Sequence, residues 1–141
     1  MALKVYFIGS GLHGCYNVRC LFPLQANGWD GDRTTFSLEH KTGDDKAKAA
    51  LAAGVVVFHR PDIKAKIELA KILKKAGKKI VFDNDDTLKE DNGFKVTEYM
   101  DAARVSRGLE KINKSIDTFV EYADLITVTT EPLKTEYAQI N

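Results

Sequence analysis

The chain has 141 residues, of which 44% are hydrophobic, so it is long enough to form one domain with its own buried core. Its 21 basic and 20 acidic residues leave a net charge of +1. This balance excludes the strong overall field that attracts nucleic acid or anionic lipid, and we expect no nucleic-acid partner.

In the N-terminal segment "KVYFIGSG" a lysine is followed by only a short apolar run. This run is far shorter than the apolar core of a signal peptide or a membrane span. Cys15 and Cys20 lie too close together in sequence to close a useful disulfide loop, which indicates reduced thiols in a cytoplasmic protein. A zinc site built from His13 and these two cysteines lacks a fourth ligand, so we expect no metal.

Strand-like and helix-like segments alternate along the chain. Runs rich in β-branched and aromatic residues predict five strands, at Leu3–Ile8, Thr34–Glu39, Val55–His59, Lys79–Asp83 and Leu125–Thr130. Helical spacing and capping residues predict helices at Cys15–Ala26 (short or kinked at Pro23), Asp44–Gly54, Asp62–Ala76, about Leu109–Tyr122, and from Glu131 onward. The segment "GWDGD" between the first helix and the second strand is predicted to be a loop.

This alternation predicts an α/β fold, a Rossmann-like three-layer αβα sandwich with a mainly parallel sheet of about five strands. We expect residues 1–141 to form a single domain. In such sheets ligands bind outside the carboxyl ends of the strands. The candidate site is therefore formed by four loops, Gly9 to Gly14, Glu39 to Thr42, His59 to Asp62 and Asp83 to Glu90, with Thr129 to Glu131 beside them.

The first loop, "GSGLHG", places Gly9, Gly11 and Gly14 in a G-x-G-x-x-G spacing directly after a strand. Glycine lets the backbone approach a phosphate closely, and Glu39 ends the next predicted strand, where a ribose-binding acid would lie. One interpretation is therefore a free-standing dinucleotide- or nucleotide-binding module.

The stretch "IVFDNDDTLKE" fits the D-x-D-x-T motif of haloacid dehalogenase-like phosphatases at Asp83, Asp85 and Thr87. In that interpretation Asp83 is the nucleophile, Asp85 the acid and base, and Mg²⁺ neutralises the clustered charge. However, the later strand brings no second acidic cluster for the metal. The structural alternative for Asp83, Asp85 and Asp86 is a solvated loop in which one residue caps a helix.

Several segments together carry a resemblance. The stretches "VVVFHRPD", "GKKIVFDNDDTL" and "ADLITVTTEPLKTEY", in this order, resemble the N-terminal domain of nucleotide-sugar glycosyltransferases of the GT-B class, group-1 family. The opening "IGSGLHGCYNVRCLFPLQANGW" is similar to the start of those sequences, although Asn17 and Val18 separate the tyrosine and arginine that are adjacent in the family. The resemblance spans nearly the whole chain.

The resemblance implies an acceptor-side domain that binds a glycan, lipid-linked or other acceptor and faces a C-terminal domain that grips the nucleotide sugar. This sequence resembles the first half only, so we expect the donor domain to be absent and the chain to be inactive alone. No cofactor is expected, with Mg²⁺ needed only by a phosphatase. A cleft face without its partner domain would also permit self-association.

In the glycosyltransferase interpretation, His59 contacts or deprotonates an acceptor hydroxyl, and the cleft acids are Asp83, Asp85 and Asp86. The residues expected to bind substrate or donor phosphate are Gly9, Gly11, Gly14, Arg19, Arg60, Thr130 and Glu131. Structural alternatives remain open for several of them. His59 could bind a neighbouring loop, Arg60 could pair with the acids after the fourth strand, and Thr130 and Glu131 could cap the last helix.

Overall fold

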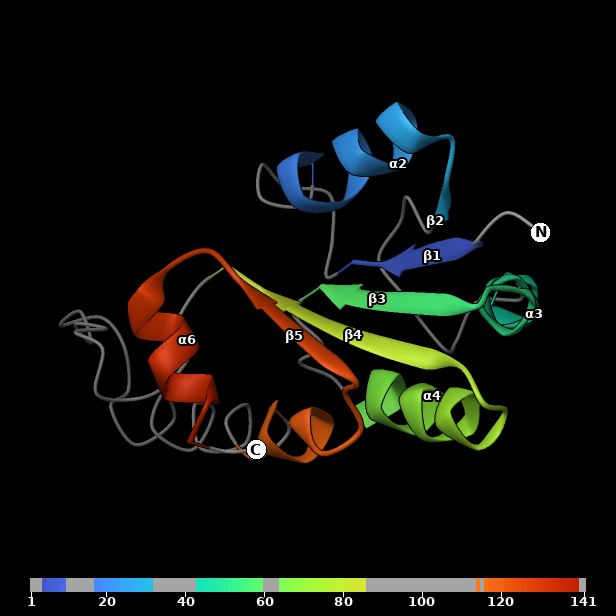
Figure 1. Ribbon diagram of the computed structural model, residues 1–141. Coiled ribbons are helices and arrows are strands. Elements are labelled where there is room, and N and C mark those ends of the chain that lie inside the picture. The colour runs from blue at the N-terminus through green and yellow to red at the C-terminus, as the bar shows by residue number, and fades with distance from the viewer. Residues whose placement is uncertain are drawn as a thin grey trace, which may run out of the picture.

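The computed structural model (Figure 1) describes residues 4–9, 17–31, 43–59, 64–85, 114 and 116–139. Its strands form one sheet in the order β2-β1-β3-β4-β5. Every neighbouring pair runs parallel. The strands are β1 (Val5–Ile8), β2 (Asp30–Gly31), β3 (Val55–His59), β4 (Lys79–Asn84) and β5 (Leu125–Val128). The α/β class with a parallel sheet is therefore confirmed.

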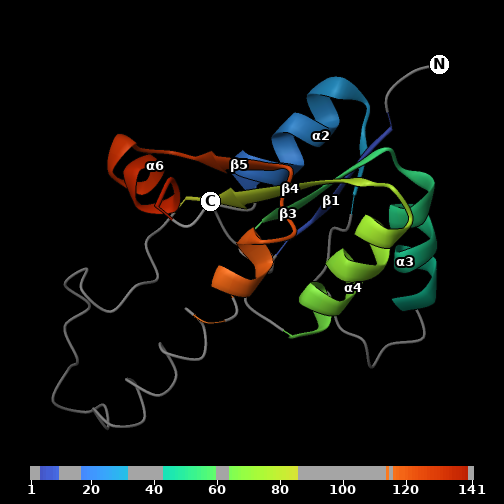
Figure 2. The same cartoon turned by 60° about the horizontal axis from the view of Figure 1, so that its bottom comes forward.

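Helices cover both faces of this sheet, and the turned view in Figure 2 shows the three layers. One face carries the π-helix η1 (Asn17–Leu21) and the following α2 (Phe22–Asn27). The other face carries α3 (Gly43–Ala52), α4 (Lys64–Lys75) and the helical residues 116–120, and α6 (Glu131–Tyr137) follows β5. The sheet has four strands of four to six residues and one edge strand, β2, of only two.

Strand β2 corrects the predicted loop in "GWDGD". Asp30 and Gly31 have low strand propensity, but they pair with Tyr6 and Phe7 at the edge of the sheet. Because α2 packs over the sheet, the chain that follows it lies beside β1. Tertiary contacts, not local propensity, therefore give Asp30 and Gly31 their extended conformation. The strand predicted at residues 34–39 lies outside the described residues.

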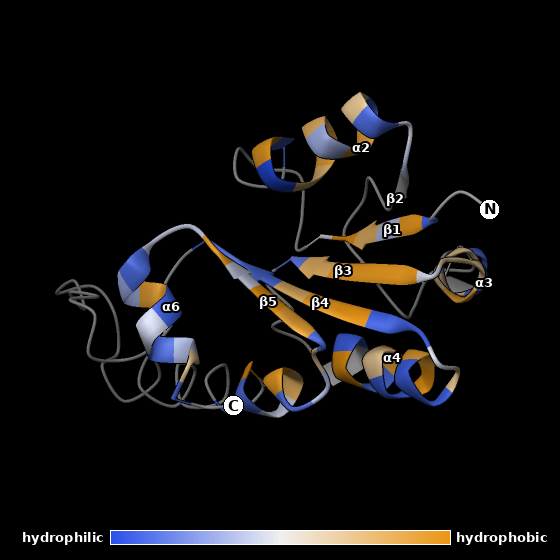
Figure 3. Cartoon of the chain, viewed as in Figure 1, coloured by the Kyte–Doolittle hydropathy of each residue, from blue (hydrophilic) through white to orange (hydrophobic). Residues whose placement is uncertain are grey.

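The larger core lies between the sheet and α3, α4 and residues 116–120. Phe119 is fully buried there, with its ring centroid 4.9 Å from that of Phe58 and 5.7 Å from that of Phe82. Phe82 also meets Tyr137 of α6, at 5.4 Å. Because side chains alternate along a strand, every second residue of β3 and β4 enters this core, and Figure 3 shows the apolar character of these strands.

The opposite face of the sheet has a smaller core. Val5, Phe7 and Val57 of the sheet pack against Cys20 of η1 and Leu24 of α2. This cover does not reach the last strand, where the side chain of Leu125 is 56% exposed. The sheet is therefore well covered on one face and partly open on the other, near β5.

Proline and glycine lie at helix boundaries, as predicted for Pro23 and Gly77 but not for Gly28. Pro23 interrupts the first helical segment, which is a π-helix to Leu21 and an α-helix from Phe22, with Pro23 in the first turn of α2. Gly28 (φ 62°) ends α2 and Gly77 (φ 74°) follows α4, both in the left-handed region that glycine tolerates. None of the helices in the described part of the chain is long and apolar enough to cross a membrane.

Candidate functional site

A row of three polar side chains crosses the carboxyl ends of the three adjacent strands β3, β4 and β5. In the strand register His59 lies opposite Asp83, and Asp83 lies opposite Thr127. The His59 Nδ1 lies 3.0 Å from Asp83 Oδ2, and the Thr127 hydroxyl donates to Asp83 Oδ1 at 2.6 Å. The sequence placed His59 and Asp83 at adjacent strand ends, as found.

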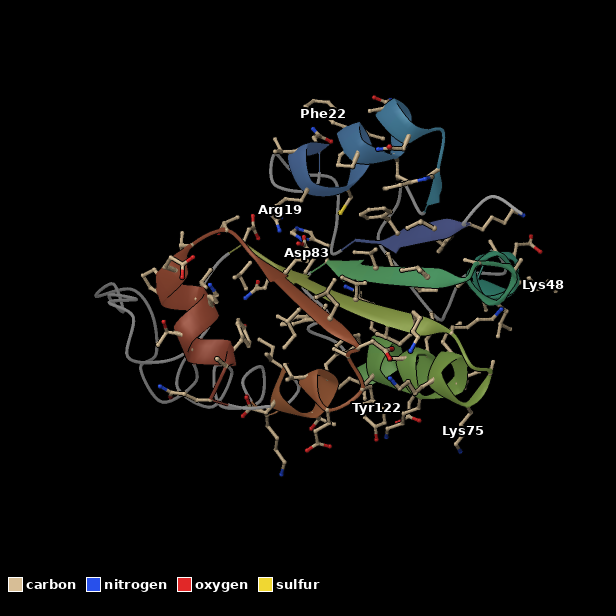
Figure 4. The ribbon with its side chains drawn as sticks, viewed as in Figure 1. Arg19, Phe22, Lys48, Lys75, Asp83 and Tyr122 are labelled. Atoms are coloured by element: carbon tan, nitrogen blue, oxygen red, sulfur yellow. The ribbon has the colours of Figure 1, made fainter. Side chains whose placement is uncertain are left out.

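The π-helix η1 supplies the fourth member of this cluster. Arg19 Nε donates to Asp83 Oδ2 at 2.9 Å, and Arg19 Nη2 donates to Asp83 Oδ1. Figure 4 shows the two side chains pointing toward each other between η1 and the strand ends. The fork of the guanidinium thus holds η1 against the sheet by a two-point contact that a lysine could not make.

These donors determine the charge state of Asp83. Burial alone would raise the pKa of this carboxyl group, but hydrogen bonds from His59, Arg19 and Thr127 lower its pKa to about 2. The group is therefore an ionised carboxylate at neutral pH. Since a carboxylate only accepts hydrogen bonds, the His59 Nδ1 carries the hydrogen in the contact with Asp83.

The donors around Asp83 also limit its chemistry. Its two oxygens accept hydrogen bonds from Arg19 Nε, Arg19 Nη2, His59 Nδ1 and Thr127 Oγ1. A carboxylate has about four lone-pair sites, so this set accounts for its capacity. A nucleophilic oxygen needs a lone pair directed at phosphorus, which this arrangement does not favour.

His59 itself lies beneath the surface, with an exposed fraction of 0%. Its ring lies between two acids, because Nε2 is 3.9 Å from Asp85 Oδ1 while Nδ1 contacts Asp83. The neighbouring Cys20 is also buried, and its burial, together with the negative charges of Asp83 and Asp85, raises the pKa of its thiol to about 12, although Arg19 and the buried Lys66 act in the opposite direction. The free thiol of Cys20 is therefore protonated and unreactive.

A groove of about 360 Å³ lies beside this cluster, on the sheet face that η1 covers. It is lined mainly by apolar side chains, with a polar end formed by Arg19, Asp83 and Thr127. Its other lining residues are Phe7, Val18, Pro23, Val57 and Val81. The volume lies within the usual range for small-molecule sites, about 300–1,000 Å³.

The remaining predicted site residues lie after β1, at the start of α6 or outside the described residues. Gly9 is buried directly after β1, whereas Gly11, Gly14, Arg60 and Asp86 lie outside the described residues. Thr130 caps α6, because its Oγ1 accepts a hydrogen bond from the N–H of Leu133 at 3.4 Å, and Glu131 occupies the first turn of α6. These two positions have the structural role that the sequence left open for them.

Thr127 is a member of this cluster that was not predicted from the sequence. Strand alternation was the available signal, since residues 125 and 127 share one face of β5 and the parallel register then brings Thr127 to Asp83. Among the described residues no group of three His, Cys, Asp or Glu side chains is arranged to hold a metal ion.

The fold and site define a Rossmann-like α/β domain with a polar cluster toward the carboxyl ends of a parallel sheet and a groove beside it, on the sheet face that η1 covers. No family model matches the sequence, and no curated protein sequence matches it. Among solved structures, a conserved protein from Enterococcus faecalis V583 is similar, with a TM-score of 0.54 and 13% sequence identity over 99% of each chain. At this identity the similarity concerns the fold alone.

Proposed function

We propose that this chain is the acceptor-side domain of a nucleotide-sugar glycosyltransferase of the GT-B class, in which transfer also requires a donor-binding domain. The observation that carries the proposal is the polar row His59–Asp83–Thr127 at the carboxyl ends of adjacent parallel strands, beside a groove of about 360 Å³. The ordered segments that resemble this family contribute these strand ends, and ligands of open α/β sheets bind there.

In this proposal the groove holds the acceptor, and the polar row orients its reacting hydroxyl. Thr127 and Arg19 line the groove and present polar atoms to it, while Asp83 fixes both of them. The buried His59 contacts the Asp83 carboxylate through Nδ1 and, in this proposal, is a positioning residue that orients Asp83. The glycine loop that begins at Gly9 would approach the donor diphosphate from across the cleft.

The two alternatives predict different contacts for the same residues. A magnesium phosphatase requires an Asp83 oxygen available for attack, whereas four donor groups already contact this carboxylate. A dinucleotide module requires its ligand to contact the loop after Gly9 rather than the groove near Thr127.

The test is an NMR titration of the ¹⁵N-labelled chain with simple glycosides, UDP-glucose, GDP-mannose and NAD. We expect glycosides to shift the amide signals of Phe7, Val57 and Thr127, with saturation, and NAD to leave them in place. Tight NAD binding with shifts centred on Gly9 would support the dinucleotide module instead. Mg²⁺-dependent hydrolysis of p-nitrophenyl phosphate that disappears in Asp83→Asn would support the phosphatase.

A further inference from the structure

We infer that the groove binds a neutral amphiphilic alcohol, whose hydroxyl end meets Thr127 and Arg19 and whose hydrocarbon part lies along the sheet. This inference rests on the proposed function in taking the groove as the acceptor site, and it specifies the class of acceptor. Two adjacent rows of side chains, one apolar and one polar, lead to it.

The apolar row crosses four strands. Phe7 pairs in register with Val57, Val57 with Val81, and Val81 with Leu125. Phe7 and Val57 are buried beneath η1 and α2, Val81 is half-buried, and Leu125 is 56% exposed. The row therefore begins under the helical cover and continues into solvent, which provides an open apolar track for a chain-like group.

The polar row lies two residues further along the same strands, so its side chains point to the same face. Thr127 and Asp83 follow Leu125 and Val81 in this way, and both line the groove. An alcohol at this end meets a threonine oxygen that can accept a hydrogen bond and a guanidinium that can donate one.

The charges at the polar end of the groove favour a neutral ligand over a strongly charged one. Arg19 and Asp83 form an ion pair, so their charges cancel at the end of the groove. A phosphate would be attracted by Arg19 but repelled by Asp83. An ammonium group would be attracted by Asp83 but repelled by Arg19. A hydroxyl group, which both donates and accepts, carries no such penalty.

The wall opposite the sheet is apolar as well. Val18 and Pro23 line the groove from η1 and α2, and the Val18 side chain is 62% exposed. A free sugar ring would leave its hydroxyl groups against these side chains without hydrogen-bond partners, which is unfavourable. A ligand with a hydrocarbon part buries both the wall and the track, so the groove favours an alkyl- or aryl-bearing acceptor over a plain sugar.

The experiment compares methyl, hexyl and octyl β-D-glucopyranoside by calorimetry and by ¹⁵N NMR, each below its critical micelle concentration. We expect the affinity to rise about two- to fourfold for each added methylene that enters the groove. The same amides, those of Val57, Val81 and Thr127, should shift throughout the series. Equal affinity across the series would overturn the inference.

Two matched variants test the location. Val18→Asp places a charge on the apolar wall, and Ile72→Asp makes the same change at a similarly exposed position on α4, away from the groove (62% and 54% exposed). Both sites are on the surface, so both variants should fold. We expect Val18→Asp to weaken octyl glucoside binding at least tenfold and Ile72→Asp to leave it unchanged. Equal effects would show adsorption elsewhere on the surface and contradict the inference.

A further comparison separates this inference from the proposed function. If 1-hexanol binds the groove as tightly as hexyl glucoside, the amphiphilic site stands and the sugar-transfer proposal loses its support. If methyl glucoside binds as tightly as hexyl glucoside, the transferase proposal stands and the amphiphilic site fails. The apolar track could also be covered by a second copy of this chain, which sedimentation at the titration concentration tests. A dimer that Val18→Asp dissociates would assign the track to that second copy and overturn the inference.

Discussion

Arg19 lies 64 positions before Asp83 in the sequence, yet its guanidinium donates two hydrogen bonds to the two oxygens of that carboxylate. The contact joins the first helical segment of the chain to the end of a central strand. Asp83 is at the same time bound by His59 and Thr127 from the strands on either side. One carboxylate therefore holds three strands and the helix that forms the wall of the groove.

Replacing Asp83 with asparagine should lower the free energy of unfolding at pH 7 by about 2 kcal/mol. The amide cannot accept from all four donors, but Arg19 is 23% exposed and regains part of its hydration, which moderates the loss. Urea denaturation measures the change. Asp45→Asn, at a side chain that is 82% exposed, is the matched control and should change stability by less than about 0.5 kcal/mol.

The same variant should alter the dependence of stability on acid. The folded-state pKa of Asp83, about 2, lies below its ordinary value of 3.8, so its stabilising contribution is complete above about pH 4 and is lost as the pH falls toward 2. We expect a shallower acid decline in Asp83→Asn. Part of the decline should remain, because Asp124 also has a pKa of about 2. Burial alone would raise the pKa of this carboxyl group, but hydrogen bonds from Lys74, the Ile80 N–H and Lys79 lower it. If the decline of stability with falling pH were unchanged in Asp83→Asn, Asp83 would not be an ionised carboxylate with a lowered pKa in the folded protein.

Replacing Thr127 with valine should cost about 1.5 kcal/mol of unfolding free energy. Valine keeps the shape and strand propensity of threonine but removes the hydroxyl that donates to Asp83 at 2.6 Å. Thr127→Ser keeps that hydroxyl and should lose less than half as much. Guanidinium denaturation of both variants decides the matter, and a loss in Thr127→Ser with none in Thr127→Val would mean that packing of the methyl group, not the hydrogen bond, matters at this position.

The positions of β3 and β4 were predictable from the sequence because these strands depend on local composition. β3 was found at the predicted residues Val55–His59, and β4 ends one residue beyond the predicted Asp83. Both are short β-branched or aromatic runs bounded by a glycine-containing turn and a polar loop, and a buried parallel strand has this composition. Since parallel neighbours end at the same edge, the proximity of His59 and Asp83 followed from the same pattern.

The partners of the polar row were not predictable in the same way. The sequence did not predict that Arg19 pairs with Asp83, because the position of η1 over the sheet face depends on how Cys20 and Leu24 pack against Val57. Thr127 depends on the register of β4 and β5, which local propensity does not specify. Long-range geometry thus decided the side-chain partners and the short edge strand β2, while local patterns decided β3 and β4.

Replacing Arg19 with lysine should loosen η1 and α2 without unfolding the sheet. Lysine keeps the positive charge but cannot contact both carboxylate oxygens in the planar two-point geometry. Hydrogen exchange followed by mass spectrometry should show faster exchange in residues 17–27, by roughly fivefold for a local loss of about 1 kcal/mol. Exchange in α4 should stay unchanged, and an equal acceleration in both segments would indicate global destabilisation instead.

Replacing Tyr137 with phenylalanine should remove a stability loss at alkaline pH. Burial raises the pKa of Tyr137 to about 12, against about 10 when unfolded, so its contribution is complete below pH 10 and is lost as the pH rises toward 12. The phenol also accepts a hydrogen bond from Asn84 Nδ2 at 2.8 Å, and its removal should cost about 1 kcal/mol at pH 7. Tyr122→Phe, at a half-buried ring that lies 5.8 Å from Lys71 Nζ, is the matched control and should keep the alkaline decline. Thermal unfolding of both variants from pH 8 to 11 makes the comparison, and an identical slope in Tyr137→Phe and the unmodified chain would refute the assignment.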